Sequence, residues 1–350
     1  MSDISIRTVG RTGRITLTRP RALNAMTYDM CLAIDAALKA WADDPGVAIL
    51  VIDAEGERAF CAGGDIAEMY ATGMAGDYAY GRRFWHDEYN MNARLAEYPK
   101  PVAAFLQGFT MGGGVGIGCH CSHRVVCETS QIAMPECGIG LIPDVGGTLL
   151  LAEAPGRLGE YLGTTGGRMG PGDALHAGFA DRFVPRAAWP ALIAALEETP
   201  DCALIDRAAR PAPVSPLAAR QAEIDAHFSG ETLGDILRGL QQQDTAFASE
   251  TLAALARNAP LSMACTVELC HRLRGPGAGI RRSLEQEYRF TFRAMEHADF
   301  LEGIRAAIID KDRAPRWRNR PDEVTPAMVA AMLMPLGDSR LKFDDGENGR

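Results

Sequence analysis

Two glycine-rich turns, each placed after a short apolar run, constrain the fold of this chain more than any other feature. The first lies in Phe60-Cys-Ala-Gly-Gly-Asp65, downstream of the apolar residues 47–52, and the second in Met111-Gly-Gly-Gly114, downstream of 102–106. A third run, 124–127, is followed by another polar turn. Short buried strands that alternate with helical segments predict an α/β layer architecture with functional groups at the strand ends.

The residues before the first turn predict a hairpin and then a helix. Residues 4–9 and 14–18 alternate apolar and polar side chains around Gly10-Arg-Thr-Gly13, which is typical of a β-hairpin. Thr27 is a suitable N-cap, and apolar side chains recur at helical spacing after it.

The pattern changes near residue 200, which predicts two regions. A polar connection with several prolines covers about 201–216, and residues 217–310 show helical periodicity. At 350 residues the chain is long enough for a large domain and an appendage. We therefore predict a core over 1–200 and a helical region over 201–350, which either covers the functional site or mediates assembly.

Charge and hydropathy exclude two classes of partner. The 36 basic and 45 acidic residues leave a net charge of −9, which is the wrong sign for a nucleic-acid or membrane-surface binder. The longest uncharged stretch, 101–123, contains Gln107, Thr110, His120 and six glycines, which argues against a membrane helix. No nucleic acid and no membrane are expected as partners.

The nine cysteines predict reduced thiols and a cytoplasmic protein. They form no CxxC pair, and the opening residues MSDISIRTVG contain no apolar segment typical of a secretion signal. The segment Cys119-His-Cys-Ser-His123 is too short for its side chains to converge tetrahedrally on a metal ion, so no metal site is expected.

The glycine turns fit no nucleotide-binding or serine-hydrolase motif. The sequence contains no GxGxxG, no GxxxxGK[ST] and no GxSxG. Glycine commonly serves sharp turns and close backbone crossings, which is one interpretation. The other is that backbone N–H groups point into a cleft, where two such donors can hold one oxyanion.

Glu136 and Asp144 are the only charged residues between 131 and 148. Burial disfavours an ionised acid, so acids in apolar surroundings are either paired or functional. Exposure on loops, with Pro143-Asp-Val-Gly-Gly147 as a simple turn, is the alternative.

Several motifs resemble the crotonase (enoyl-CoA hydratase/isomerase) superfamily. Arg19-Pro-x-Ala-Leu-Asn-Ala25 is similar to its N-terminal acyl-CoA motif, and the two glycine turns are similar to its two oxyanion turns. Residues 134–147 and Glu302-Gly-Ile-Arg-Ala-x-x-Ile-Asp-Lys-Asp312 most resemble the members that hydrolyse 3-hydroxyisobutyryl-CoA. The resemblance extends over about 10–343 and implies a crotonase-like fold of repeated β-β-α units with a helical C-terminal region.

The resemblance implies a role for individual residues. The backbone N–H groups of Gly64 and Gly113 would form the oxyanion hole, and Glu136 and Asp144 would be the catalytic acids. Six further residues would bind the acyl-CoA substrate: Leu23, Ala25, Ala62, Asp65, Ile66 and Glu88. No cofactor is expected, because CoA is part of the substrate.

The placement of the acids favours a hydrolase over a hydratase. The hydratases of the superfamily carry a glutamate where this chain has Gly116, and a glycine where it has Asp144. We therefore expect a thioesterase that hydrolyses a short β-hydroxyacyl-CoA, with Glu136 either attacking the thioester or activating water. The resemblance implies 3-hydroxyisobutyryl-CoA as the substrate and valine catabolism as the pathway. An enoyl-CoA hydratase or isomerase, and a non-catalytic acyl-CoA-binding protein, are the alternatives. The resemblance also implies a homo-oligomer.

Overall fold

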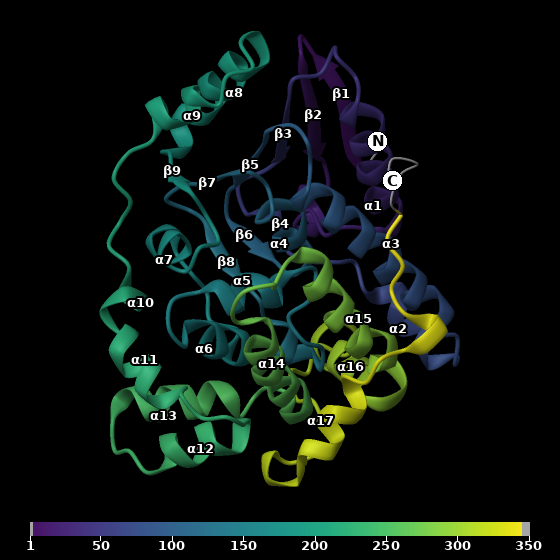
Figure 1. The fold of residues 1–350 in the computed structure, drawn as a ribbon, viewed down its shortest axis with the longest axis vertical. Coiled ribbons are helices and arrows are strands. Elements are labelled where there is room, and N and C mark those ends of the chain that lie inside the picture. Colours follow the sequence, from purple (N-terminus) through teal and green to yellow (C-terminus); the bar gives the residue numbers. More distant parts are fainter. Residues whose placement is uncertain (1–2, 345–350) are drawn as a thin grey trace.

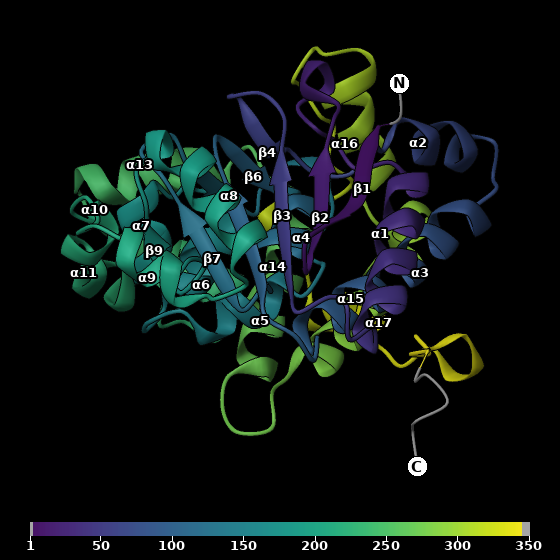
Figure 2. The same cartoon turned by 90° about the horizontal axis from the view of Figure 1, so that it is seen from above.

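Two sheets form the framework of the computed structural model, which describes residues 3–344. The larger has strand order β1-β2-β3-β5-β7-β9 and the smaller β4-β6-β8 (Figures 1 and 2). The β1–β2 pair is antiparallel, and the other described pairs are parallel. The strands are β1 (Ile4–Val9), β2 (Thr12–Leu17), β3 (Ile49–Ala54), β4 (Ala59–Cys61), β5 (Val102–Leu106), β6 (Phe109–Met111), β7 (His123–Val126), β8 (Gln131–Ala133) and β9 (Arg182–Phe183).

From β3 to β8, successive strands alternate between the two sheets, and a helix or helical turn follows each pair. The strands β3 and β4 lead to α2, β5 and β6 lead to α4, and β7 and β8 lead to η2 and α5. This order confirms the predicted α/β fold of repeated β-β-α units. Its helices are α1 (Tyr28–Ala42), α2 (Ala67–Met74), α3 (Ala79–Ala96), α4 (Gly113–Gly118), α5 (Gly147–Glu153), α6 (Leu158–Thr165), α7 (Pro171–His176), α8 (Trp189–Glu198) and α9 (Ala203–Ala208), with the 3₁₀ turns η1 (Pro20–Ala22), η2 (Glu136–Ile139) and η3 (Arg186–Ala188).

The predicted hairpin and first helix are confirmed. Gly10, with a φ of 57°, turns the chain between β1 and β2. The Thr27 side chain accepts a hydrogen bond from the Met30 N–H at 3.2 Å, which caps α1. The strand predicted over 47–52 lies two residues later, because Asp53 pairs in register with β2 and its carboxylate binds Arg14 at 2.5 Å.

Sequence patterns missed the small sheet. Its strands β4, β6 and β8 have three residues each, too few to show a period of two. Both glycine turns follow strands of this sheet directly, and β4 and β6 are adjacent in it. The small sheet therefore brings the two turns together.

The large sheet has an apolar core on each face. Alternate residues such as Val51 and Phe105 face α8 and α9, where the Trp189 ring lies 5.2 Å from that of Phe105. Their neighbours in sequence, such as Ile52 and Leu106, belong to a larger core on the opposite face. That core continues from the sheet into the C-terminal helices.

The region after residue 208 is helical, as predicted. An extended connection over 209–215 leads from α9 to α10 (Figure 1). Helix α14 packs on α5 and α6, and α15 packs on α3. The division into two domains stays a prediction. The helices are α10 (Pro216–Ala219), α11 (Gln221–His227), α12 (Leu233–Gln241), α13 (Ala246–Leu255), α14 (Pro260–Leu273), α15 (Ile280–His297), α16 (Phe300–Ile304) and α17 (Pro326–Met332), with the π-helix η4 (Arg305–Ile309) and the 3₁₀ turns η5 (Pro321–Glu323) and η6 (Gly337–Ser339).

Over the described residues, no helix combines the length and the apolar character that crossing a membrane requires.

Candidate active site

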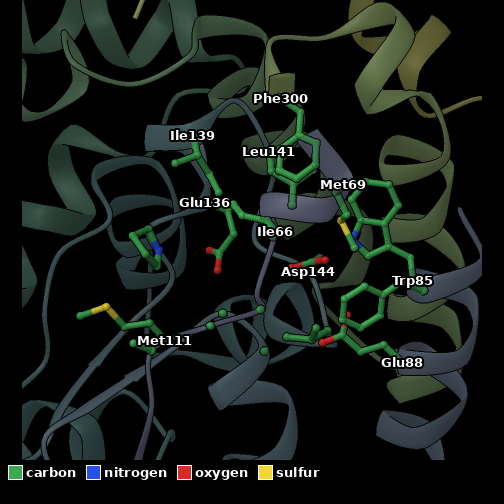
Figure 3. Close-up of a pocket in the computed structure, with 18 of the residues that line it drawn as sticks. Ile66, Met69, Trp85, Glu88, Met111, Glu136, Ile139, Leu141, Asp144 and Phe300 are labelled. Atoms are coloured by element: carbon green, nitrogen blue, oxygen red, sulfur yellow. The ribbon is translucent and has the colours of Figure 1, made fainter. Parts of the chain in front are cut away.

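A cavity of about 250 Å³ lies where the two glycine turns meet the segment after β8 (Figure 3). Apolar side chains form most of its wall, and Glu88, Glu136 and Asp144 extend into the space between them (Figure 3). The lining residues are Ala62, Gly63, Gly64, Ile66, Met69, Phe84, Trp85, Glu88, Met111, Gly112, Gly113, Pro135, Glu136, Ile139, Leu141, Asp144, Val145, Phe300 and Ile308.

The first glycine turn leaves a backbone donor free. Met26 pairs with the turn, donating its N–H to the Gly63 carbonyl at 2.9 Å and accepting from the Asp65 N–H at 2.8 Å. These bonds fix the peptides on either side of Gly64. Within residues 3–344 the Gly64 N–H makes no hydrogen bond.

The second turn presents a donor at the start of α4. Gly112 is the N-cap, with a φ of 49°, and its carbonyl accepts from the N–H groups of Val115 and Gly116. The N–H of Gly113 lies in the first turn of the helix, where backbone donors have no partner within the helix.

The two turns are in contact, and a side chain at Gly112 would be excluded. A Cβ atom at Gly113 would lie 3.5 Å from the Gly64 nitrogen and 3.1 Å from Oε1 of Glu88. A Cβ atom at Gly112 would lie 2.8 Å from Oε1 of Glu136. The structure therefore brings both predicted oxyanion donors and two of the predicted acids into one site.

Three buried acids share this cavity. Glu88, Glu136 and Asp144 are each only 5% exposed. Burial raises the pKa of all three, and the charge of Asp144 raises the pKa of Glu88 and Glu136 further. The pKa of Asp144 rises to about 7 through burial and the charge of Glu287, against the hydrogen bond that Tyr89 donates to its Oδ2 at 2.8 Å.

The acids cannot all ionise together at neutral pH. No lysine, arginine or histidine lines the cavity to balance them, and like charges at close range disfavour simultaneous ionisation. The Oε2 atom of Glu136 has no hydrogen-bond partner within the described chain. Asp144 can therefore exchange a proton at a pH near 7, and Glu136 holds a buried oxygen whose hydrogen-bonding capacity is unused.

The predicted substrate-binding residues fall into two groups. Ala62, Ile66 and Glu88 line the cavity. The other three border the first turn without lining the cavity: Leu23 accepts a hydrogen bond from the Ala62 N–H at 3.1 Å, and the Arg19 guanidinium binds both the Ala25 carbonyl and the Asp65 carboxylate. The roles assigned to all six stay predictions.

The space around Gly116 has no room for the side chain of an acid. A Cβ atom there would lie 2.7 Å from Nδ2 of Asn92 and 2.8 Å from Cβ of Val145. The space for a longer side chain is thus filled by α3 and by the residue after Asp144.

Sequence reasoning missed three residues around Asp144. Tyr89 donates to its carboxylate, Glu287 binds the backbone that follows it, and the His120 Nε2 lies 2.9 Å from the Val145 carbonyl. Burial lowers the pKa of His120 to about 4, so the neutral ring donates to this carbonyl. Within 3–344 no three His, Cys, Asp or Glu side chains gather as a metal site would require.

The C-terminal region completes the cavity. Phe300 of α16 contributes to its wall (Figure 3). Ile308 of η4 also lines the cavity. A Cβ atom at Gly303 would lie 2.1 Å from the Ile139 carbonyl oxygen, so α16 packs directly on the backbone after Glu136. The helical region therefore covers one side of the site.

Comparisons with known proteins agree with this geometry. A family model described as "Enoyl-CoA hydratase/isomerase" matches residues 12–333. Proteins named "3-hydroxyisobutyryl-CoA hydrolase, mitochondrial" from Gallus gallus and Homo sapiens are 34% and 35% identical, over 98% and 97% of this chain and 91% of each relative.

Two solved structures match almost the whole chain. An enoyl-CoA hydratase from Rhodobacter sphaeroides 2.4.1 is 60% identical with a TM-score of 0.94, covering 98% of this chain and all of that one. A carnitinyl-CoA dehydratase from Mycobacterium thermoresistibile is 38% identical with a TM-score of 0.93, covering 99% of this chain and all of that one. The chain therefore belongs to the enoyl-CoA hydratase/isomerase family of the crotonase superfamily.

Proposed function

We propose that this enzyme hydrolyses a short β-hydroxyacyl-CoA thioester, with 3-hydroxyisobutyryl-CoA as the favoured substrate, to the free acid and CoA. The names of the curated relatives support this substrate. One observation carries the proposal. Glu136 lies beside Gly112 with an unpartnered oxygen, next to the two free backbone donors. An acid in this position suits attack at a carbonyl carbon polarised by those donors.

The oxyanion hole would bind the thioester oxygen. The N–H groups of Gly64 and Gly113 would both donate to it, and charge develops on this oxygen as the carbonyl carbon becomes tetrahedral. A preorganised donor of this kind stabilises the transition state by about 3 kcal/mol. Apolar walls around Trp85 and Phe300 would strengthen the effect by excluding water.

Two routes for Glu136 satisfy the balance of bonds and protons. In one, the carboxylate takes a proton from water, and the hydroxide bonds to the carbonyl carbon. In the other, the carboxylate itself bonds to that carbon, and water hydrolyses the resulting anhydride. In both, the C–S bond breaks and CoA leaves as a thiolate, which needs little proton assistance because a thiol has a pKa of about 8.5.

Asp144 would act near the thioester carbonyl of the acyl group, and Glu88 would act near its β-hydroxyl. Asp144, held by Tyr89, would orient the water or the Glu136 carboxylate. Glu88 lies beside Gly113 and would bind the β-hydroxyl. A β-hydroxyl would thus meet a polar partner in an otherwise apolar wall.

An enoyl-CoA hydratase is the second candidate, because the 60% identical structure bears that name. Hydration needs acids placed to deliver a hydroxyl and a proton to adjacent carbons. The filled space at Gly116 argues against it, since the second glutamate of the hydratases has no room there.

One experiment separates the two candidates. The purified enzyme is incubated with 3-hydroxyisobutyryl-CoA while free thiol is titrated, and with crotonyl-CoA while the enoyl absorbance is followed. We expect thiol release with the first ester and no loss of absorbance with the second. Absorbance loss without thiol release would favour the hydratase. If neither thiol release nor absorbance loss is seen, a non-catalytic acyl-CoA-binding protein would be favoured.

Three further proposals concern cofactors and metals, the oligomeric state and the cellular compartment. We propose that no cofactor and no metal take part, that the enzyme forms a homo-oligomer, and that it is cytoplasmic. The vertebrate relatives are named as mitochondrial, which makes the compartment a point to test by fractionation.

A further inference from the structure

Helix α15 carries a buried polar stripe directly behind Asp144. Ser283, Glu287 and Thr291 recur every fourth residue, so they share one helix face, and none of them is exposed. Polar residues are costly inside a core unless hydrogen bonds satisfy them. Apart from hydrogen bonds within α15 itself, their partners lie on the segment that carries Asp144 or on Tyr89, which donates to Asp144.

Glu287 is the centre of this stripe. Its Oε2 accepts the Gly146 N–H at 2.8 Å, and its Oε1 accepts the Thr148 N–H at 3.0 Å, the Ser283 hydroxyl at 3.0 Å and the Thr148 hydroxyl. Burial raises the pKa of Glu287, and these hydrogen bonds oppose the rise. Both backbone partners are obligate donors, which favours the carboxylate form.

The turn that Glu287 holds is strained. Val145 has a φ of 54° and Gly146 a φ of 81°, so two successive residues are left-handed. A β-branched residue rarely adopts this conformation, and such a residue persists only when its surroundings hold it. His120 holds the Val145 carbonyl on one side, and Glu287 holds the Gly146 N–H on the other.

The strained turn determines where Asp144 points. Asp144 immediately precedes Val145, and its carboxylate faces the same cavity as Glu136. A relaxed turn would swing this carboxylate relative to the two glycine donors. Misplacement of a reacting group by about 1 Å can lower a rate by about 10²-fold.

We propose that Glu287 is a positioning residue for the hydrolysis proposed above: it fixes the turn over 144–148 so that Asp144 faces Glu136, and its negative charge sets the pH range in which the acid pair works. The inference rests on the proposed function.

The titratable groups around Asp144 determine in which direction its pKa should change when Glu287 is replaced. Glu88 and Tyr89 face it from α3, Glu136 from η2, and Glu287 from α15, while neutral His120 binds the next carbonyl. Removing the Glu287 charge takes away one of the negative charges that oppose ionisation of Asp144. The pKa of Asp144 should therefore fall.

The test compares three variants by the pH profile of kcat/KM for thiol release. Glu287→Gln removes the charge and keeps the shape, whereas Glu287→Asp keeps the charge on a shorter side chain. Glu160→Gln is the matched control, because Glu160 is also fully buried but binds Arg157, Arg274 and His271 away from the cavity.

We expect Glu287→Gln to lower kcat/KM by about 10²-fold and to move the acidic limb of the profile to lower pH. Glu287→Asp should lower kcat/KM and leave the limb in place, and Glu160→Gln should lower the melting temperature alone. An unmoved limb in Glu287→Gln, or kcat/KM equal to that of the wild type, would overturn the proposal.

A second measurement is independent of turnover. In protein with ¹³C-labelled aspartate carboxyls, the Asp144 signal is assigned by its absence in Asp144→Asn and titrated in wild type and Glu287→Gln. We expect a lower midpoint in the variant, and an equal midpoint would contradict the role of the Glu287 charge. A lower midpoint in an enzyme that releases no thiol would mean that only the proposed function has failed.

Discussion

Three adjacent glycines, Gly112, Gly113 and Gly114, differ in what an added side chain would meet. A side chain at Gly114 would collide with the Cys61 carbonyl, which is a matter of packing. A side chain at Gly112 would strike the Glu136 carboxylate, and one at Gly113 would approach Gly64. The packing interpretation of glycine therefore holds at Gly114, and the role of the Gly113 N–H as an oxyanion donor stays a prediction.

Glu136 is the residue on which the proposed chemistry depends. Glu136→Gln keeps the size of the side chain but removes both the nucleophilic oxygen and the base. We expect thiol release to fall by about 10³-fold or more, with binding of the CoA ester retained. Calorimetric titration with the ester checks binding, and Glu153→Gln, on an exposed residue of α5, is the control. Retained turnover in Glu136→Gln would show that another acid is responsible.

Asp144 should make stability depend on pH. Its pKa rises from near 3.8 to about 7 on folding, so the folded state holds a proton that the unfolded state has lost between these values. Its contribution to stability is complete below pH 4 and is lost as the pH rises through 7. The full difference corresponds to roughly 4 kcal/mol at most.

Asp144→Asn removes this dependence while keeping an acceptor for Tyr89. We expect its melting temperature to exceed that of the wild type at pH 8, with the difference shrinking as the pH falls to 4. Melting curves by circular dichroism at several pH values measure it. The same difference at every pH would mean that Asp144 titrates normally.

At the scale of elements, α16 depends on backbone contact with η2. Gly303 lies against the Ile139 carbonyl, and Gly140, with a φ of 73°, lies against Asp299 in the same way. This close approach places Phe300 over the cavity. The short helix thus covers the site without long side chains at the contact.

Gly303→Ala should lift α16 from this contact. We expect a loss of about 1–3 kcal/mol in the free energy of unfolding, together with a higher KM because the cavity wall shifts. Gly239→Ala is the matched control, since Gly239 lies in α12 with nothing within 4 Å of an added Cβ atom. That variant should gain up to about 1 kcal/mol, because alanine favours helix more than glycine does. Denaturant unfolding of the Gly303→Ala and Gly239→Ala variants measures the difference in unfolding free energy, and steady-state kinetics measures the difference in KM.

At the scale of the whole molecule, one apolar core joins the two predicted regions. Ile15 in β2 and Leu341 near the C-terminal end belong to the same buried cluster. The proline-containing connection over 209–215 is thus a boundary along the sequence and does not separate two cores. Because the core is shared, C-terminal helices that are distant in sequence reach the site: α16 lines the cavity with Phe300, and α15 carries the proposed positioning residue Glu287.

A shared core predicts a single cooperative unfolding transition. We expect the calorimetric and van't Hoff enthalpies of the full chain to agree. Two separated transitions in differential scanning calorimetry would instead show that the regions over 1–200 and 201–350 fold as independent domains.

The sequence by itself determined the local elements, and the family resemblance of its motifs implied the β-β-α repeat and the chemistry-bearing residues. Hairpin turns, helix caps and apolar runs depend on neighbouring residues, so they can be read along the chain. Motif resemblance placed Gly64, Gly113, Glu136 and Asp144, which the structure collects in one cavity.

Only the tertiary structure decided which side chains surround those acids. The three-residue strands of the small sheet form because adjacent strands of the sheet pair with them, and no local sequence pattern predicts them. Glu287 lies 143 residues from Asp144 in sequence and reaches its turn only because α15 packs behind α5. Burial and neighbouring charges depend on such long-range contacts, and they set the protonation of the acids that the sequence could only name.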